Sequence, residues 1–137
     1  MAGYSTTPQA RKLGLKPGVR LAVVGRPPGW DFEEPPAEVA VDDVSQVGGA
    51  APADVVVWFV PAAAALDALP DLAERIFPAG AIWVAWPRKA AGHVSDVDEN
   101  LIRATALGLG LVDVKVAAID TDWSGLKVCW RKENRTR

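Results

Sequence analysis

A short loop containing two glycines is the first place in this sequence where the residue types suggest ligand binding. An apolar run at residues 19–24 leads into Gly25, Arg26, Pro27, Pro28 and Gly29. Domains that bind dinucleotides or methyl donors begin with a buried strand that ends in glycine, because the backbone must turn sharply there and let a ligand come close. Here two prolines stand where further glycines are expected, and proline has no N–H to donate to an anion. The loop therefore indicates a Rossmann-like start that has largely lost its capacity to cradle an anion.

Basic, aromatic and polar side chains also follow the later apolar runs. In an open parallel sheet, ligands bind beyond the carboxyl ends of the strands, so the loops after these runs should meet at one edge. The candidate ligand-binding residues in these loops are Gly25, Arg26, Gly29, Trp86, Arg88, Lys89, His93, Asp122, Trp123 and Ser124. A rim of this kind would hold an anionic, planar ligand, such as a nucleotide or an acyl-carrier fragment, by charge-assisted hydrogen bonds and stacking.

Structural roles are the alternative for the same residues. Arg88 and Lys89 also fit the solvated exit of a strand, and His93 also fits an exposed loop histidine without a ligand. Trp123 is better explained as a plug over the sheet edge, with Asp122 capping the turn through its side chain.

The inventory of reactive side chains gives little support to catalysis, and we assign no catalytic residue. A set of Ser124, His93 and Asp120 is conceivable, but no nucleophile elbow surrounds the serine. One histidine and one cysteine make a transition-metal site improbable, and Cys129 lies in an apolar run that predicts a packed strand residue. Methyl transfer would need an acidic residue at the end of the second strand to hold the ribose of the donor. Asp42 or Asp43 falls near that point, but the prolines disfavour S-adenosylmethionine as a cofactor.

The elements that must position these residues alternate between strands and helices. Strands are predicted at residues 19–24, 38–41 (weak), 55–60, 81–86, 111–119 and 126–130. Helices are predicted at residues 8–13, from Pro61 with a break or restart at Pro70, and from a capping box of Ser95 and Asp98 to Gly108 and Gly110. Residues 120–125 suit a tight hairpin loop. The pattern predicts a three-layer α/β fold with a mainly parallel sheet and a closing antiparallel hairpin.

Length and composition set the remaining expectations. With 137 residues, half of them hydrophobic, the chain is expected to form one domain over residues 1–137, with an N-terminal helix and turn at 1–18 and a frayed tail at 131–137. A single cysteine, and the lack of a signal-like or membrane-spanning run, favour a cytoplasmic protein without a membrane partner. The net charge is −2, with bases gathered before residue 30 and acids directly after it, so nucleic-acid binding is not expected and both groups are interpreted as solvated faces.

Four short motifs carry a resemblance to a known family. They are the segment 12–18 (KLGLKPG), Val57-Trp58, Ile82-Trp83 with Pro87-Arg88-Lys89, and the segment 122–125 (DWSG). Together they resemble the bacterial family catalogued as domain of unknown function 3052, over residues 4 to 131. The order of elements also looks like a class I methyltransferase fold that has lost one or two early elements. The resemblance implies a fold and a bacterial, cytoplasmic setting, but no activity.

Three functions remain open from the sequence. The leading one is a non-catalytic binding or regulatory module for a small anionic ligand or a protein partner, which predicts a shallow basic shelf at Arg26, Arg88 and Lys89. A minimal methyltransferase or other nucleotide-dependent transferase predicts a deep pocket from Gly25 to Asp42 or Asp43. A structural subunit that dimerises through an edge strand predicts an exposed apolar patch.

Overall fold

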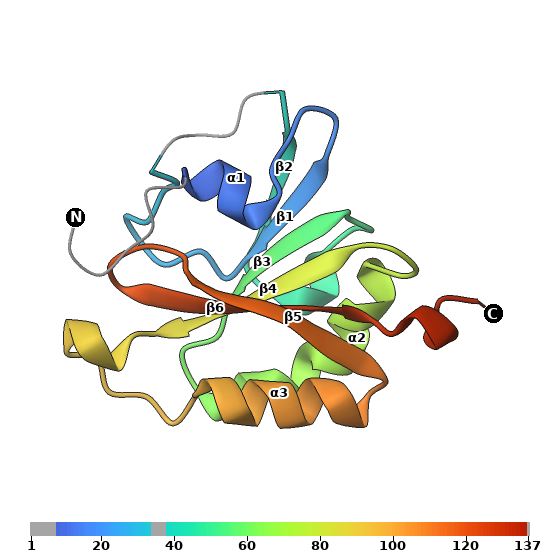
Figure 1. Ribbon diagram of the computed structural model, residues 1–137. Helices are drawn as coiled ribbons and strands as arrows, with labels where there is room; N and C mark the ends of the chain where they lie inside the picture. The colour runs from blue at the N-terminus through green and yellow to red at the C-terminus, as the bar shows by residue number, and fades with distance from the viewer. Residues whose placement is uncertain (1–7, 34–37, 137) are drawn as a thin grey trace.

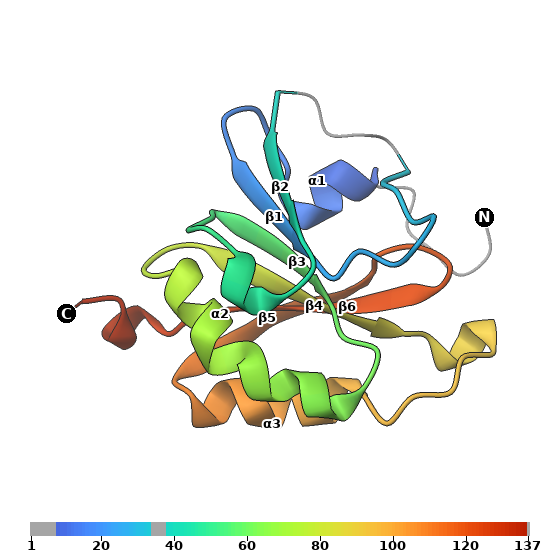
Figure 2. The ribbon, with the colours of Figure 1, turned by 180° about the vertical axis from the view of Figure 1, so that it is seen from behind.

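The fold, described for residues 8–33 and 38–136 in a computed structural model, is an α/β sandwich built on one six-stranded sheet (Figures 1 and 2). The strand order is β2-β1-β3-β4-β6-β5. The strands are β1 (Arg20–Val24), β2 (Ala40–Val44), β3 (Val55–Phe59), β4 (Ala81–Pro87), β5 (Leu111–Ala118) and β6 (Trp123–Trp130). The α-helices are α1 (Gln9–Leu13), α2 (Leu69–Arg75) and α3 (Glu99–Gly108), and short 3-10 helices are η1 (Val47–Gly49), η2 (Ala63–Ala68), η3 (Lys89–Ala91) and η4 (Lys132–Asn134).

The sheet is mixed, so the prediction of a mainly parallel sheet holds for one part of it. β2, β1, β3 and β4 pair in parallel, whereas β6 pairs antiparallel with both β4 and β5. The predicted hairpin is present as β5 and β6, but its second strand lies inside the sheet and its first strand forms the edge. Because the parallel strands all end on the same side, the loops after β1, β2, β3 and β4 meet at one carboxyl edge.

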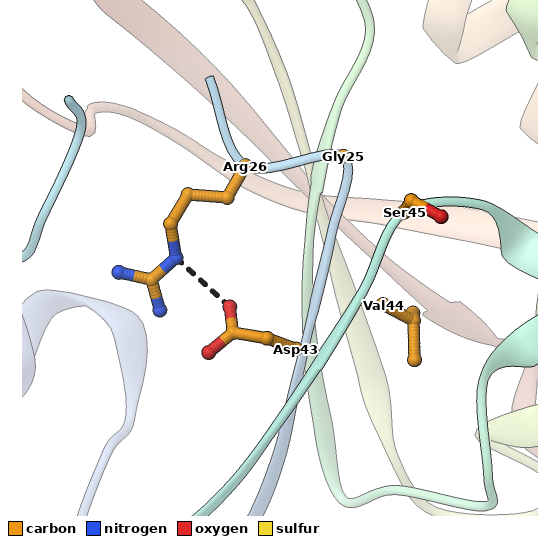
Figure 3. A pocket seen from close by; sticks show the side chains of 5 residues that line it. All are labelled: Gly25, Arg26, Asp43, Val44 and Ser45. Atoms are coloured by element: carbon orange, nitrogen blue, oxygen red, sulfur yellow. Dashed lines mark hydrogen bonds and ion pairs between the residues drawn. The ribbon is translucent and has the colours of Figure 1, made fainter. Parts of the chain in front are cut away.

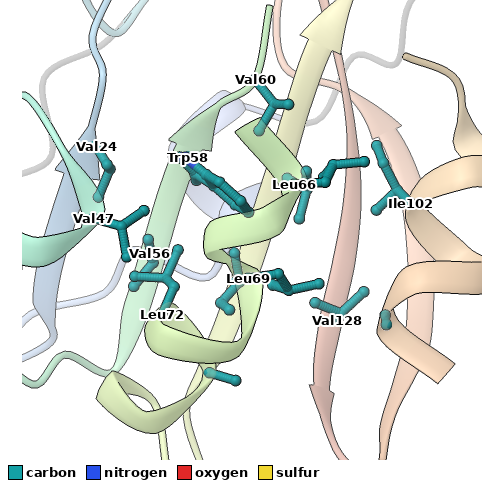
Figure 4. Close-up of a cluster of buried hydrophobic side chains, with 14 of the residues drawn as sticks. Val24, Val47, Val56, Trp58, Val60, Leu66, Leu69, Leu72, Ile102 and Val128 are labelled. Atoms are coloured by element: carbon teal, nitrogen blue, oxygen red, sulfur yellow. The ribbon is translucent and has the colours of Figure 1, made fainter. Parts of the chain in front are cut away.

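The larger core lies on the sheet face covered by η1, η2, α2 and α3, which we call the helix face (Figures 2 and 4). Val56 and Trp58 of β3 and Leu69 and Leu72 of α2 are at most 3% exposed there. Alternate residues of β3 point to the two faces, and every residue of this strand is buried. Residues 55–60 therefore do not alternate between apolar and polar side chains, because helices or loops cover both faces of this strand.

The opposite face, which we call the α1 face, is covered by α1 and by the segment after β1. Its core includes Leu13, Phe32, Phe59 and Trp83. The indole nitrogen of the fully buried Trp83 donates a hydrogen bond to the carbonyl of Leu13 at 3.2 Å, which fixes the end of α1 on β4. Helical elements thus lie on both sides of the sheet, in the three layers that the sequence predicts.

Several predicted boundaries shift for local reasons. The weak strand lies at residues 40–44 instead of 38–41, because pairing with β1 decides its position. The helix expected to start at Ser95 starts after Asp98, whose side chain accepts a hydrogen bond from the amide of Leu101 at 2.8 Å. The hydroxyl of Ser95 instead donates to the carbonyl of Pro61. The second hairpin strand begins at Trp123, so the connecting loop is shorter than residues 120–125.

The C-terminal segment, predicted to fray, makes contacts that its polar composition does not indicate. It contains η4, and the side-chain amide of Asn134 donates to the carbonyl of Gly110 at 3.0 Å. The guanidinium of Arg135 donates to the carbonyl of Trp130. Cys129, predicted to be a packed strand residue, lies in β6 and is partly buried.

Candidate ligand site at the carboxyl edge

An open surface pocket of about 630 Å³ lies where β1 and β2 end (Figure 3). Its lining consists of Gly25, Arg26, Asp43, Val44 and Ser45. Gly25 has φ +71° and its amide donates to the carbonyl of Val44 at 2.9 Å, so the turn after β1 is tied to the end of β2. A Cβ atom at Gly25 would lie 3.4 Å from the carbonyl oxygen of Phe59, and the positive φ itself favours glycine at this position.

The guanidinium of Arg26, which lines this pocket, is held by two carboxylates. Its Nε donates to Asp43 Oδ1 at 2.8 Å, the contact drawn in Figure 3, and its NH1 group donates to Asp31 Oδ1 at 3.1 Å. The same guanidinium lies 5.5 Å from the ring centres of both Trp30 and Phe32, within the range of a cation–π contact. One positive charge therefore faces two negative charges, and the immediate surroundings of the pocket are acidic overall.

Trp30 lies between the Arg26 side chain and an aromatic cluster on the α1 face. Its ring packs edge-on against Phe32 at 4.9 Å and Phe59 at 4.8 Å, and Phe59 packs in the same way against Trp123 at 5.0 Å. The indole nitrogen of Trp30 donates to Asp120 Oδ2 at 2.6 Å. Trp30 is therefore part of the packing that closes this end of the sheet.

The turn between β5 and β6 is capped by Asp120 and not, as predicted, by Asp122. Asp120 Oδ1 accepts hydrogen bonds from the amides of Asp122 and Trp123 at 2.8 and 2.9 Å. The prediction was wrong because Asp120 stands at the first position of the turn, where a carboxylate reaches the amides two and three residues ahead. Trp123 covers the sheet edge beside Phe59, as its interpretation as a plug implies.

Arg88 and His93 of the rim also have partners within the protein. The NH1 group of Arg88 donates to the carbonyls of Asp120 and Thr121, both at 3.3 Å, and His93 Nε2 lies 3.0 Å from Asp122 Oδ1. His93 is thus paired with Asp122, whereas the conceivable set of Ser124, His93 and Asp120 would need Asp120. The hydrogen bonds of Asp120 go to Trp30 and to the turn instead.

The structure brings only part of the predicted rim to the pocket. Gly25 and Arg26 line it, but Arg88 and Lys89 do not, so the predicted basic shelf is not the lining of this pocket. Lys89 lies exposed in η3, and Gly29 is exposed with φ +76°. Trp86 is buried in the core of the helix face, which accounts for its apolar surroundings in the sequence. Ser124 lies in β6, where its backbone is paired with Trp86.

Sequence reasoning missed Asp31 and Ser45. Asp31 belongs to a run of acids that was interpreted as a solvated face, and Ser45 follows a strand whose end was placed too early. Ser45 could have been identified if the end of β2 had been placed correctly, because the residue after a parallel strand lies at the carboxyl edge. The pairing of Asp31 with Arg26 depends on how the loop folds back, and no spacing rule indicates it.

Shifted pKa values occur away from this pocket. A side-chain hydrogen bond from Arg20 lowers the pKa of Asp54, and the pair lies at the opposite, amino-terminal edge of β1 and β3. A side-chain hydrogen bond from Arg103 of α3 likewise lowers the pKa of Asp113 in β5. These ion pairs join elements of the fold, and neither faces the candidate site.

The described residues offer neither a metal-binding cluster nor a membrane-spanning helix. Within residues 8–33 and 38–136, no group of three or more histidine, cysteine, aspartate or glutamate side chains could hold a metal ion. No helix in the described part of the chain has the length and apolar character needed to cross a membrane.

Comparison with known proteins gives a fold likeness and no family. No family model matches the chain, so the resemblance to domain of unknown function 3052 is not confirmed, and no curated protein matches its sequence. Among solved structures, the fold is similar to magnesium protoporphyrin IX methyltransferase from Synechocystis, solved with SAM bound, with a TM-score of 0.62 and 13% identity. That likeness covers 90% of this chain and 74% of the methyltransferase.

Two other solved structures have a similar fold. A protein of the NADB-Rossmann superfamily from Streptococcus agalactiae matches with a TM-score of 0.58 and 11% identity, over 99% of this chain and 74% of that protein. A protein from Thermoplasma acidophilum, described provisionally as a methyltransferase, matches with a TM-score of 0.52 and 10% identity, over 94% of this chain and 76% of the other. The chain therefore has an α/β, Rossmann-like fold of the kind found in class I methyltransferases.

Proposed function

We propose that the protein is a non-catalytic binding module that takes a neutral, hydroxyl-rich small molecule, such as a nucleoside, in the pocket formed by the ends of β1 and β2. The observation that carries the proposal is the placement of Asp43 and Ser45 in a pocket at the carboxyl edge of a Rossmann-like sheet. A carboxylate and a hydroxyl are suitable partners for ligand hydroxyl groups. A volume of about 630 Å³ is in the usual range for small-molecule sites.

The charges around the pocket argue for a neutral ligand over the anionic one expected from the sequence. Among the described residues, Arg26 is the only basic one that lines the pocket, and this side chain already contacts Asp43 and Asp31. An anion would have to displace one of these carboxylates and leave it without its cation, which costs part of the binding energy. A ligand with hydroxyl donors can instead bind the second oxygen of Asp43 while the ion pair persists.

The residues present do not match a methyl-donor site. Pro27 and Pro28 follow directly on Arg26, and neither has an N–H to donate to the carboxylate of the donor. Of the two acids considered for the donor ribose, Asp42 does not line this pocket, so only Asp43 could serve there. Among the described residues, no hydroxyl or thiol group is hydrogen-bonded to the ring of His93, so a paired nucleophile and base are lacking there.

A thermal-shift and calorimetry panel tests the proposal. The ligands are adenosine, AMP, ATP, S-adenosylmethionine and its demethylated product, and the variants are Asp43→Asn and the control Asp67→Asn at an exposed position of η2. We expect adenosine to raise the melting temperature and to bind at least as tightly as AMP. We expect Asp43→Asn to weaken adenosine binding about tenfold and Asp67→Asn to leave it unchanged. A ligand at ~100 times its Kd stabilises by about 2.7 kcal/mol, which such a scan resolves.

The proposal would be overturned in favour of an anionic ligand, of a transferase, or of no ligand at this pocket, depending on the result. Binding confined to AMP and ATP would restore the anionic ligand. A much stronger effect of S-adenosylmethionine than of adenosine would favour the transferase. The absence of any shift, or equal shifts in Asp43→Asn and the wild type, would show that this pocket is not a ligand site of the proposed kind.

A further inference from the structure

β2 is an edge strand with an unusually accessible surface. In the described part of the chain, β1 pairs with one side of β2 and no strand pairs with its other side. Residues 40–43 are exposed and Val44 is half-buried. An open strand edge is a template on which another extended segment can pair, unless the protein covers or blocks it.

The backbone of β2 offers an ordered set of free groups along this edge. The carbonyls of Glu38 and Val44 accept hydrogen bonds from Gly18 and Gly25, so these even-numbered residues direct their backbone groups toward β1. Because the backbone groups of successive residues point alternately to the two sides of a strand, Val41 and Asp43 direct their N–H and C=O groups outward. Two donors and two acceptors are thereby presented to an added strand.

The two carboxylates of this edge lie on opposite faces of the sheet. On the helix face, Ala40 and Asp42 line a largely apolar hollow of about 270 Å³ together with residues 51–53. Asp43 pairs with Val23 of the α1-face core, so its carboxylate lies on the α1 face, beside the pocket at the carboxyl edge. An added strand would send alternate side chains to the two faces, and each face provides a carboxylate to receive one.

The charge of the edge identifies the kind of partner. Asp42 makes no ion pair with any other described residue, and Asp43 shares Arg26 with Asp31. A second copy of this chain would bring the same carboxylates opposite one another, which is unfavourable in a cross-strand pair. Lysine or arginine side chains would instead cover the apolar hollow with their aliphatic stems and reach the carboxylates with their charged ends.

From this arrangement we propose that the free edge of β2 binds an extended, basic segment of a protein partner as a seventh strand. Main-chain hydrogen bonds to Val41 and Asp43 provide the affinity, and the carboxylates on the two faces select adjacent basic residues in the partner. Asp43 belongs both to this edge and to the pocket at the carboxyl edge, whereas Val41 and Asp42 lie outside that pocket, so substitutions at these two residues test the added strand separately from the ligand proposed above.

The test uses a synthetic peptide of about eight residues with a central Lys-Lys pair flanked by valine and threonine, matching the usual length of a strand. A peptide with Glu-Glu at the centre is the charge control. Affinity is measured by fluorescence anisotropy, and amide hydrogen exchange reports which backbone groups become protected. We expect the basic peptide alone to bind, and the amides of Val41 and Asp43 to exchange at least tenfold more slowly in its presence.

Substitutions at Val41 separate backbone pairing from simple charge attraction. Val41→Pro removes the outward N–H without removing a bond to β1, whereas Val41→Thr keeps the N–H and the branched shape. We expect Val41→Pro to weaken binding of the basic peptide at least tenfold and Val41→Thr to leave it unchanged. Asp42→Asn should weaken binding several-fold and make it less dependent on salt concentration. Circular dichroism checks that Val41→Pro folds. If it does not fold, the test rests on whether the basic peptide protects the Val41 and Asp43 amides of the wild type from exchange.

The proposal is overturned by any of four results: no binding of the basic peptide, equal binding of the acidic one, protection confined to amides outside β2, or unchanged binding by a folded Val41→Pro variant. Protection of the β2 amides without peptide, in a protein that sediments as a dimer, would also overturn it in favour of a second copy. The ligand proposal would be untouched by these results, since its readouts are adenosine binding and the Asp43→Asn variant.

Discussion

Replacing Gln9 by methionine would test whether one buried amide holds three segments of the protein together. Gln9 is 3% exposed at the start of α1. Its side-chain nitrogen donates to the carbonyl of Ile119 at 2.7 Å, and its side-chain oxygen accepts from the amide of Glu33 at 2.9 Å. The amide thus links α1 to the segment after β1 and to the turn after β5. Methionine has a similar shape, so the change removes both hydrogen bonds without leaving a large cavity.

The expected loss follows from the two backbone groups left behind. Ile119 is fully buried, so its carbonyl bears most of the desolvation cost, whereas Glu33 is exposed and its amide can turn to water. A buried, unpaired polar group costs about 1–3 kcal/mol, and the two losses together should come to about 2–3 kcal/mol. In a domain of this size that corresponds to a fall of roughly 6–10 °C in the melting temperature.

Urea unfolding followed by circular dichroism measures this loss. Gln46→Met is the matched control, because Gln46 is exposed beside η1, and surface substitutions usually change stability by less than about 0.5 kcal/mol. The reasoning would be refuted if Gln9→Met unfolded within about 0.5 kcal/mol of the wild type, since water or a shift of α1 would then be replacing both hydrogen bonds.

Two further stability predictions concern packing and pH. Gly125→Ala should destabilise the protein by about 1–3 kcal/mol, because the added Cβ atom would lie 2.7 Å from Ile119 Cδ1. Gly108→Ala is the control, since no atom lies within 4 Å of its added Cβ, and it should not destabilise. Chemical denaturation of both variants measures the difference. The hydrogen bond from Arg20 lowers the pKa of Asp54, so the stability it contributes is fully present above the unfolded pKa of about 3.9 and is lost as the pH falls through the lower pKa of the folded protein. The wild type should therefore have a higher melting temperature than Asp54→Asn at pH 6, and the difference should shrink as the pH falls below about 3.9; a difference that is constant with pH would contradict this.

The sequence predicts best where a single local pattern decides the structure. The run at residues 55–60 is apolar throughout and forms β3 as expected, because few other structures bury both sides of such a segment. Pro70 marks a restart, as predicted, since α2 has this proline in its first turn. In contrast, β2 contains Asp42 and Asp43, so the pattern predicts only a weak strand that stops at residue 41, and the observed position is set by pairing with β1.

The site is less predictable because its decisive contacts connect distant residues. The gathering of bases before residue 30 and of acids after it was interpreted as two solvated faces, yet Arg26 folds back onto Asp31 and Asp43. Both groups are thereby neutralised in part by each other. The bond between Trp30 and Asp120 joins residues ninety positions apart, and no spacing rule indicates it.

The position of β6 inside the sheet affects the order in which the fold can be completed. This strand is made last among the six, yet it separates β4 from β5 and pairs with both. While the chain is being synthesised, β4 must wait with one open edge until residues 123–130 leave the ribosome, and β5 has no partner before that moment. The buried Trp83 pairs with Lys127 in this register, so the centre of the sheet is sealed only after β6 has been made.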